Sequence, residues 1–183
     1  MIDLLELHKL FILRHLGPGD TAVDFTMGNG HDTVFLSQTV GEQGHVYAFD
    51  IQPQALESTE KHLKEAGCPN NVTLILDSHH QIASYVKKPF KAGMFNLGWL
   101  PGGDKSVTTQ RETTLKALES GLALLDHDGI ILLAVYPGHA EGTAEGQEVQ
   151  AYLSSLSRYQ ICATLVRIVN SPDSPYFFII EKK

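Results

Sequence analysis

Residues 24–30 of this 183-residue chain could hold a small ligand. Asp24, Gly28 and Gly30 form the pattern Asp-x-x-x-Gly-x-Gly directly after the apolar run 21–25. Glycines allow a tight turn and a close backbone approach, and an open α/β sheet binds ligands beyond the carboxyl ends of its strands. Thr33 occupies the place of the third glycine of a dinucleotide fingerprint. The pattern favours the amino-acid end of S-adenosylmethionine over a pyrophosphate, and taken alone it is also typical of a plain turn.

Acidic residues also end the next two predicted strands. Asp50, with Gln52 close behind, follows 45–49, and Asp77, with Ser78 and His79, follows 72–76. A carboxylate at the second strand end can accept both ribose hydroxyls, and a carboxylate or hydroxyl at the third can meet the adenine amino group. Each acid could instead cap the following helix. Because both acids accompany the glycine turn, we expect a cofactor site.

The fourth predicted strand ends in the segment 95–105, where chemistry-bearing residue types are densest. Asn96-Leu97-Gly98-Trp99 resembles the Asn-Pro-Pro-aromatic motif of amino-group methyltransferases, with Leu-Gly in place of Pro-Pro. In that motif the asparagine oxygen and a backbone carbonyl accept hydrogen bonds from the target amine, which orients it for attack. An aromatic ring can stack on an unstacked nucleobase. The alternative is that Trp99 is a core residue and Gly102-Gly103 a simple turn.

These segments require a sheet whose strands alternate with helices. Apolar periodicity predicts helices at 4–16, 32–39, 53–67, 82–86, 108–125 and 144–156, and strands at 21–25, 45–49, 72–76, 92–97, 129–136, 163–169 and 176–180. This order predicts a Rossmann-like α/β fold of the class I methyltransferase type. We expect a mostly parallel seven-stranded sheet with one antiparallel edge strand, helices on both faces, and a single domain over residues 1–183.

Composition narrows the class of protein further. The 43% hydrophobic and 19% charged content is typical of a globular chain, and no apolar run approaches the roughly 20 residues that cross a bilayer. Cys68 and Cys162 suggest neither a disulfide framework nor a metal site, which fits a cytoplasmic protein. The net charge of −7 argues against broad nucleic-acid binding. Lys87, Lys88 and Lys91 form either a solvated face or, together with Lys105, a local basic patch near the catalytic edge.

The segments 24–33, 96–105 and 136–139 together resemble the YtqB-type methyltransferases, also called MnmM and long labelled rRNA methylases. The resemblance covers nearly the whole chain, and Leu-Pro-Gly-Gly-Asp-Lys at 100–105 is its most distinctive element. It implies that S-adenosylmethionine is the cofactor. It also implies that the substrate is tRNA, in which the aminomethyl group of 5-aminomethyl-2-thiouridine at the wobble position becomes methylaminomethyl.

The resemblance also implies individual roles. The cofactor would contact Asn29, Asp32, Asp50, Gln52, Ser78 and His79, beside Asp24, Gly28, Gly30 and Asp77 from the strand-end pattern. The substrate side would contain Asn96, Trp99, Asp104 and His139. A primary amine is mostly protonated near neutral pH, so Asp104, His139 or water must take its proton. His139 could equally be a surface residue of a Pro-Gly turn.

Several alternatives remain at this stage. An NAD-dependent oxidoreductase also uses a glycine turn and an acid at the second strand end. The absent third glycine and the Asn-x-x-Trp segment argue against it. A non-catalytic RNA-binding module with the same fold, and a methyltransferase acting on ribosomal RNA or a small molecule, are the other candidates. A homodimer is left open.

Overall fold

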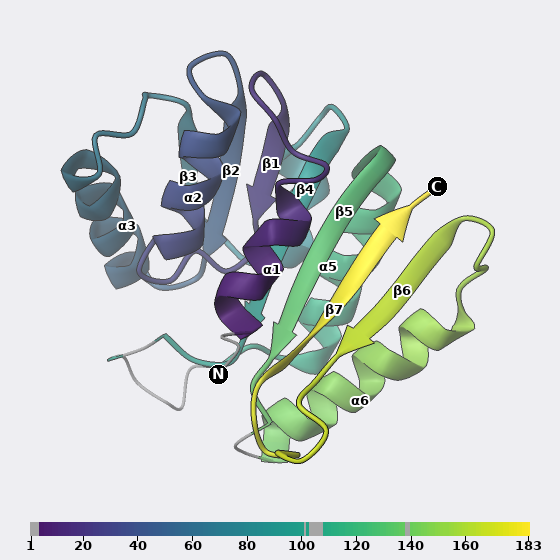
Figure 1. The fold of residues 1–183 in the computed structure, drawn as a ribbon. Coiled ribbons are helices and arrows are strands. Elements are labelled where there is room, and N and C mark those ends of the chain that lie inside the picture. Colours follow the sequence, from purple (N-terminus) through teal and green to yellow (C-terminus); the bar gives the residue numbers. More distant parts are fainter. Residues whose placement is uncertain (1–3, 101, 103–107, 138–139) are drawn as a thin grey trace.

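The computed structural model describes residues 4–100, 102, 108–137 and 140–183. Its seven strands form one sheet in the order β3-β2-β1-β4-β5-β7-β6 (Figure 1). The strands are β1 (Thr21–Asp24), β2 (His45–Asp50), β3 (Val72–Leu76), β4 (Phe90–Leu97), β5 (Leu125–Val135), β6 (Ile161–Val166) and β7 (Tyr176–Lys182). Strands β1 to β5 are mutually parallel, whereas β7 is antiparallel to both β5 and β6. The predicted fold is confirmed, and its antiparallel strand lies one place inside the edge, which β6 occupies.

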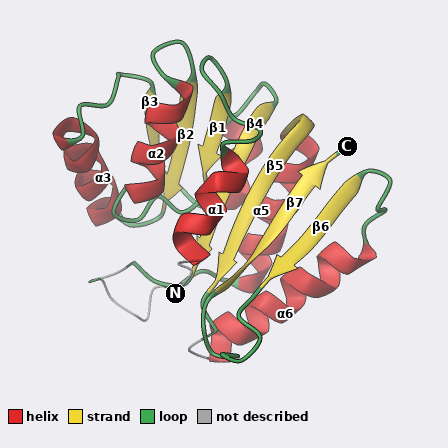
Figure 2. Ribbon diagram, viewed as in Figure 1, coloured by secondary structure: helices red, strands yellow, loops and turns green. Residues whose placement is uncertain are grey.

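Helices cover both faces of this sheet (Figure 2). On one face lie α1 (Leu4–Ile12), α2 (His31–Val40) and α3 (Pro53–Glu65), and on the other α5 (Arg111–Leu124) and α6 (Ala140–Ser155). A 3₁₀ turn (His79–Gln81) leads into the short α4 (Ile82–Tyr85), which packs against α5. Within the described part of the chain, no helix is long and apolar enough to span a membrane.

Alternation along β5 shows how one strand serves both faces. Ile131, Leu133 and Val135 belong to the core cluster that includes Leu118 of α5, and Ile130, Leu132 and Ala134 to the cluster that includes Ile12 of α1. Successive side chains of a strand point to opposite faces. A continuous apolar run is therefore what a strand covered on both sides requires.

One predicted boundary differs in a way that shapes the functional edge. The helix expected from residue 108 begins at Arg111, because the chain before it pairs with the end of β4. Thr108 forms a β-bridge with Trp99, and Thr109 donates its N–H to the carbonyl oxygen of Gly98 at 3.0 Å. Local periodicity does not reveal this pairing, which fixes the segment after β4 against the start of α5.

Candidate active site

Two adjoining cavities lie beyond the carboxyl ends of β1 to β5. The larger has a volume of about 550 Å³ and the smaller about 300 Å³, both within or near the range of small-molecule sites. Residues that line both cavities come from the ends of β1 and β4: Thr26, Gly28, Asn96, Gly98 and Trp99. The parallel sheet thus brings the glycine turn and the Asn96 segment together, as the sequence predicted.

The glycine turn connects the two cavities. Gly28 has φ +50 and donates its N–H to Oδ2 of Asp50 at 3.1 Å. Gly30 has φ +86, and a Cβ there would lie 2.9 Å from atoms of Thr59 on α3. Gly30 lines neither cavity. Its glycine is required by the left-handed backbone and by the close approach of α3 rather than by a ligand.

Asp24 supports the turn from below. It is fully buried and lines neither cavity. Its carboxylate accepts hydrogen bonds from the Thr33 hydroxyl at 2.6 Å and the Thr26 N–H at 3.1 Å. Burial, together with the negative charge of Asp32, raises the pKa of Asp24 to about 7 despite these hydrogen bonds. In the described structure Asp24 thus shapes the turn and does not face the ligand space predicted for it.

The smaller cavity contains the acids predicted at the second and third strand ends. Asp50 accepts the N–H groups of Gly28 and Gln52, and Asp77 accepts the N–H of Ser78 and the hydroxyl of Tyr85. Burial raises the pKa of Asp50, while hydrogen bonds from the backbone N–H groups of Gln52, Gly28 and Ile51 partly offset that effect. A carboxylate offers about four acceptor positions, so Asp50 can still accept hydroxyl groups from a ligand.

His79 places a buried, neutral ring in the wall of the same cavity. Its Nδ1 lies 3.1 Å from the carbonyl oxygen of Phe25, which can only accept, so Nδ1 carries the hydrogen. Nε2 has no hydrogen-bond partner among the residues that the structure describes. Burial lowers the pKa of His79 to about 4, which keeps the ring uncharged at neutral pH. The lone pair of Nε2 lies buried within the cavity wall and is not open to the ligand space.

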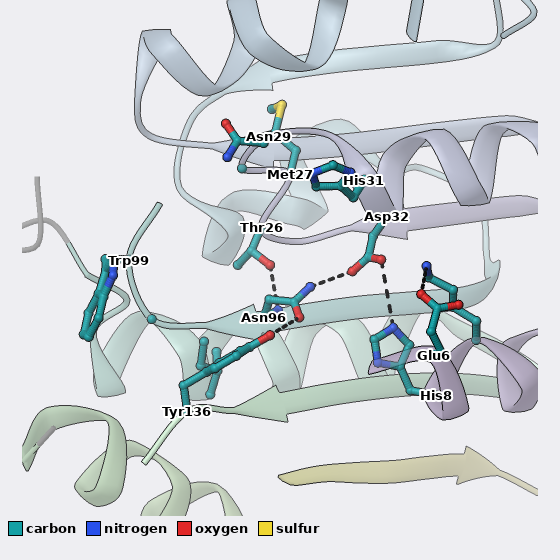
Figure 3. A pocket seen from close by; sticks show the side chains of 14 residues that line it. Glu6, His8, Thr26, Met27, Asn29, His31, Asp32, Asn96, Trp99 and Tyr136 are labelled. Atoms are coloured by element: carbon teal, nitrogen blue, oxygen red, sulfur yellow. Dashed lines mark hydrogen bonds and ion pairs between the residues drawn. The ribbon is translucent and has the colours of Figure 1, made fainter. Parts of the chain in front are cut away.

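In the larger cavity, polar side chains from different elements bond to one another (Figure 3). The amide nitrogen of Asn96 donates to Oδ2 of Asp32 at 2.6 Å, and the hydroxyl of Tyr136 lies 3.4 Å from Oδ1 of Asn96. The backbone N–H of Asn96 donates to the Thr26 hydroxyl at 2.7 Å. Burial alone would raise the pKa of Asp32, but His8 and the Asn96 amide outweigh it and lower that pKa. Asp32 is therefore a carboxylate at neutral pH.

The larger cavity also contains residues that the sequence did not single out. Glu6, His8 and Lys9 enter from α1, and Tyr136 directly follows β5. Tyr136 could have been found, because it follows a parallel strand as Asp50 and Asn96 do. The α1 residues carry no such signal, since their helix precedes the sheet and reaches the cavity only through packing.

The remaining predicted site residues divide by position. Gly28, Asn29 and Asp32 line the larger cavity, and Asp50, Gln52, Asp77, Ser78 and His79 line the smaller one. Trp99 is half-buried and lies at the opposite end of the larger cavity from His8 (Figure 3). It is therefore not a fully buried core tryptophan. Asp104 and His139 lie outside the described residues.

The lysine cluster does not lie where the sequence suggested. Lys87, Lys88 and Lys91 surround the amino end of β4, whereas Asn96 lies at its carboxyl end. At about 3.3 Å per strand residue, Lys91 and Asn96 are roughly 17 Å apart along β4. Lys87 and Lys91 donate to the carbonyl oxygens of Ala83 and His127. The expected basic patch near the catalytic edge is wrong for these three lysines, and Lys105 lies outside the described residues.

Comparisons with known families and structures agree with this geometry. The family described as "Putative rRNA methylase" matches residues 46–182. A crystal structure of a "putative rRNA-methylase" from Clostridium thermocellum superposes with a TM-score of 0.97 at 38% identity, covering 100% of this chain and 99% of that one. A methyltransferase from Streptococcus mutans, crystallised with S-adenosylhomocysteine, has a TM-score of 0.91 at 38% identity, with coverages of 100% and 99%.

A curated plant relative carries a more specific name. The chloroplastic tRNA (mnm(5)s(2)U34)-methyltransferase of Arabidopsis thaliana is 37% identical over 178 residues, which is 90% of this chain. The chain spans 64% of the length of that relative. The two solved relatives, by contrast, match over nearly their whole length.

Proposed function

This chain belongs to the family described as "Putative rRNA methylase", and from that membership we propose that it is an S-adenosylmethionine-dependent N-methyltransferase of tRNA. The substrate group is the aminomethyl group of 5-aminomethyl-2-thiouridine at the wobble position. The product is 5-methylaminomethyl-2-thiouridine. The name of the plant relative and the S-adenosylhomocysteine bound in the Streptococcus mutans relative support this proposal.

The residues of the smaller cavity fit the adenosine half of the cofactor. Asp50 can accept ribose hydroxyls, and the Asp77 carboxylate or the Ser78 hydroxyl can meet the adenine amino group. Phe49 and Ile51 supply apolar surface in the same cavity. The larger cavity, with Asn29 and Asp32, has room for the amino-acid half. When bound, the cofactor supplies an electrophilic methyl group on a sulfonium.

The observation that carries the proposal is the position of Asn96, which lines both cavities. Its amide nitrogen is held by Asp32, and the Tyr136 hydroxyl donates to Oδ1 at 3.4 Å. The second lone pair of Oδ1 can accept a hydrogen bond from a target N–H. Acceptors that orient the nitrogen lone pair toward the methyl carbon accelerate transfer by positioning. Trp99 offers a stacking surface beside Asn96, as recognition of an unstacked base requires.

The direct test is methyl transfer from labelled cofactor to tRNA isolated from cells that lack the wobble methylation. We expect the label in 5-methylaminomethyl-2-thiouridine when digested nucleosides are separated by mass spectrometry. Label in ribosomal RNA alone would identify ribosomal RNA as the substrate. The absence of turnover with every RNA would favour a non-catalytic RNA-binding module. Parallel titrations with S-adenosylhomocysteine and NAD test the cofactor, and saturable binding of NAD alone would overturn the methyltransferase assignment.

The proposal also concerns the organisation of the chain and its assembly. The described strands share one sheet, which supports a single catalytic domain over residues 1–183. Cysteines without a disulfide framework support a cytoplasmic location, and Cys68 and Cys162 are both unpaired. A homodimer is testable by light scattering of the purified protein with and without tRNA.

A further inference from the structure

His8 of α1 is a buried histidine whose ring faces the larger cavity. Its side chain is 4% exposed and its Nε2 has no hydrogen-bond partner among the described residues. That nitrogen lies 3.9 Å from Oδ1 of Asp32, too far for a hydrogen bond but close enough for an ion pair when the ring is protonated. A buried polar atom that lacks a partner is costly, unless a ligand completes it.

Asp32 is the only group through which His8 reaches the rest of the described polar network. Asn96 occupies Oδ2 of Asp32, while Oδ1 faces both His8 and the cavity (Figure 3). The other face of the His8 ring packs edge-on against Phe177 of β7, with ring centroids 6.1 Å apart. His8 can therefore change its charge without losing a hydrogen bond, and Asp32 is the group that responds.

We propose that Asp32 holds a cationic amine in the larger cavity and that His8 controls whether this carboxylate is available. This inference rests on the proposed function, which supplies two such amines: the α-amino group of the cofactor and the aminomethyl group of the substrate. A neutral His8 leaves the negative charge of Asp32 to the amine. A protonated His8 pairs with Asp32 and opposes amine binding by competition for Oδ1 and by charge repulsion. His8 is in this sense a positioning residue.

Other titratable groups around His8 contribute to the same electrostatic balance. They are Asp32 of α2, Tyr136 after β5, Glu6 and Lys9 on α1 itself, and His31 on the opposite cavity wall. Lys9 forms an ion pair with Glu6 at 2.9 Å, so their opposite charges largely cancel at His8. Asp24 lies beneath Asp32 and is itself largely protonated below its pKa of about 7. Asp32 is thus the nearest fixed negative charge to His8.

The first experiment measures the pair without any ligand or turnover. The pKa of His8 is followed by NMR titration in the parent and in Asp32→Asn, with His8→Gln to assign the signal. Removing the carboxylate 3.9 Å away should make the His8 ring harder to protonate, because an opposite charge favours the protonated form. His15 serves as the matched control, because it interacts with Asp128 and Glu181 and lies outside both cavities. An unchanged pKa of His8 overturns the proposal.

The second experiment separates the two amines. Calorimetry gives the affinity for S-adenosylhomocysteine between pH 7.5 and 5.5. With that ligand saturating, two anticodon stem-loops are compared, one bearing 5-aminomethyl-2-thiouridine and one an unmodified uridine. If His8 controls Asp32, one of two quantities should fall about tenfold as the pH is lowered across this range. These are the affinity for S-adenosylhomocysteine and the ratio of the affinities for the modified and unmodified stem-loops. The fall should disappear in His8→Gln and persist in His15→Gln.

The outcomes decide which amine Asp32 holds and whether His8 controls it. A pH effect on S-adenosylhomocysteine assigns Asp32 to the cofactor amine, and an effect on the stem-loop ratio assigns it to the substrate amine. An effect that persists in His8→Gln, or none in either arm, overturns the proposal. The stem-loop could be neither bound nor methylated while the affinity for S-adenosylhomocysteine still falls with pH as expected. In that case the tRNA assignment fails and the role of His8 stands. Thermal melts confirm that His8→Gln folds.

Discussion

The two cavities are built in different ways from the same sheet edge. In the smaller one, Asp50 and Asp77 are held by N–H groups of their own loops or of the adjacent glycine turn. In the larger one, Asp32, Asn96 and Tyr136 are held by one another, although 40 to 64 residues separate them along the chain. In the smaller cavity, the backbone hydrogen bonds that hold the two acids span at most 22 residues of the chain. The network of the larger cavity exists only after α2, β4 and β5 have assembled.

This contrast suggests a division of labour. A locally built site tolerates loss of one side chain because the remaining loop keeps its shape. A network assembled from distant elements loses its geometry when one member is removed, since side chains in contact are energetically coupled. Substitution of Asn96 should therefore affect methyl transfer more than cofactor affinity, whereas substitution of Asp50 should affect cofactor affinity.

The sharpest test is Asn96→Ala. We expect the single-turnover rate of methyl transfer to fall about a hundredfold, as for other losses of reactant positioning. The affinity for S-adenosylhomocysteine, measured by calorimetry, should change much less. Asn70→Ala, in the exposed loop before β3, is the matched control. A parent-like rate in Asn96→Ala would show that this segment is structural and would remove the proposed mechanism.

Asp50→Ala tests the opposite cavity. We expect binding of S-adenosylhomocysteine to weaken by about 1.5 to 3 kcal/mol, the range for hydrogen bonds to a charged group. The rate at saturating cofactor should stay within a few-fold of the parent rate. Asp126→Ala, at the far end of β5, controls for general effects of removing an acid. Unchanged affinity in calorimetry would place the ribose elsewhere.

His79→Gln tests whether the histidine in the wall of the smaller cavity is held neutral by burial. In the folded protein the pKa of His79 is about 4, against 6.5 for the free side chain. The unfolded chain therefore binds more protons between these values, and this site lowers stability as the pH falls below 6.5. Between pH 7 and 5.5 the parent should lose about 1 kcal/mol more unfolding free energy than the variant. Urea titrations measure it, and the opposing effect of Asp24 is common to both proteins.

The smallest effect is expected at the opposite ends of the strands, around the amino end of β4. Replacing Lys87, Lys88 and Lys91 together by alanine should change tRNA methylation by less than about twofold, because these lysines lie far from the cavities. The salt dependence of tRNA affinity should also stay constant. Each lysine that contacted a phosphate would instead reduce the slope of log affinity against log salt by about 0.9. A clear reduction would mean that the RNA extends around the sheet edge.

The same contrast explains what the sequence could predict. Asp50, Asp77 and Asn96 each follow an apolar run, so chain position alone places them at the carboxyl edge. Asp24 and Gly30 belong to the same motif, but burial and the approach of Thr59 decide their roles, and neither is visible in a local pattern. His8 carries no signal, because α1 meets Asp32 only through the packed core. The lysine cluster was misplaced because closeness to Asn96 in sequence is not closeness in space: Lys87, Lys88 and Lys91 lie at the amino end of β4, a strand length away.

The position of β7 constrains how the chain can fold. β6 precedes β7 in sequence, yet β7 lies between β5 and β6 and supplies the only sheet partner of β6 within the described structure. β6 can therefore enter the sheet only with β7 or after it. Until residues 176–182 arrive, the free edge of β5 is an unpaired apolar strand, the kind of edge that promotes association between chains. Insertion of β7 thus pairs the exposed edge of β5, the strand that Tyr136 directly follows.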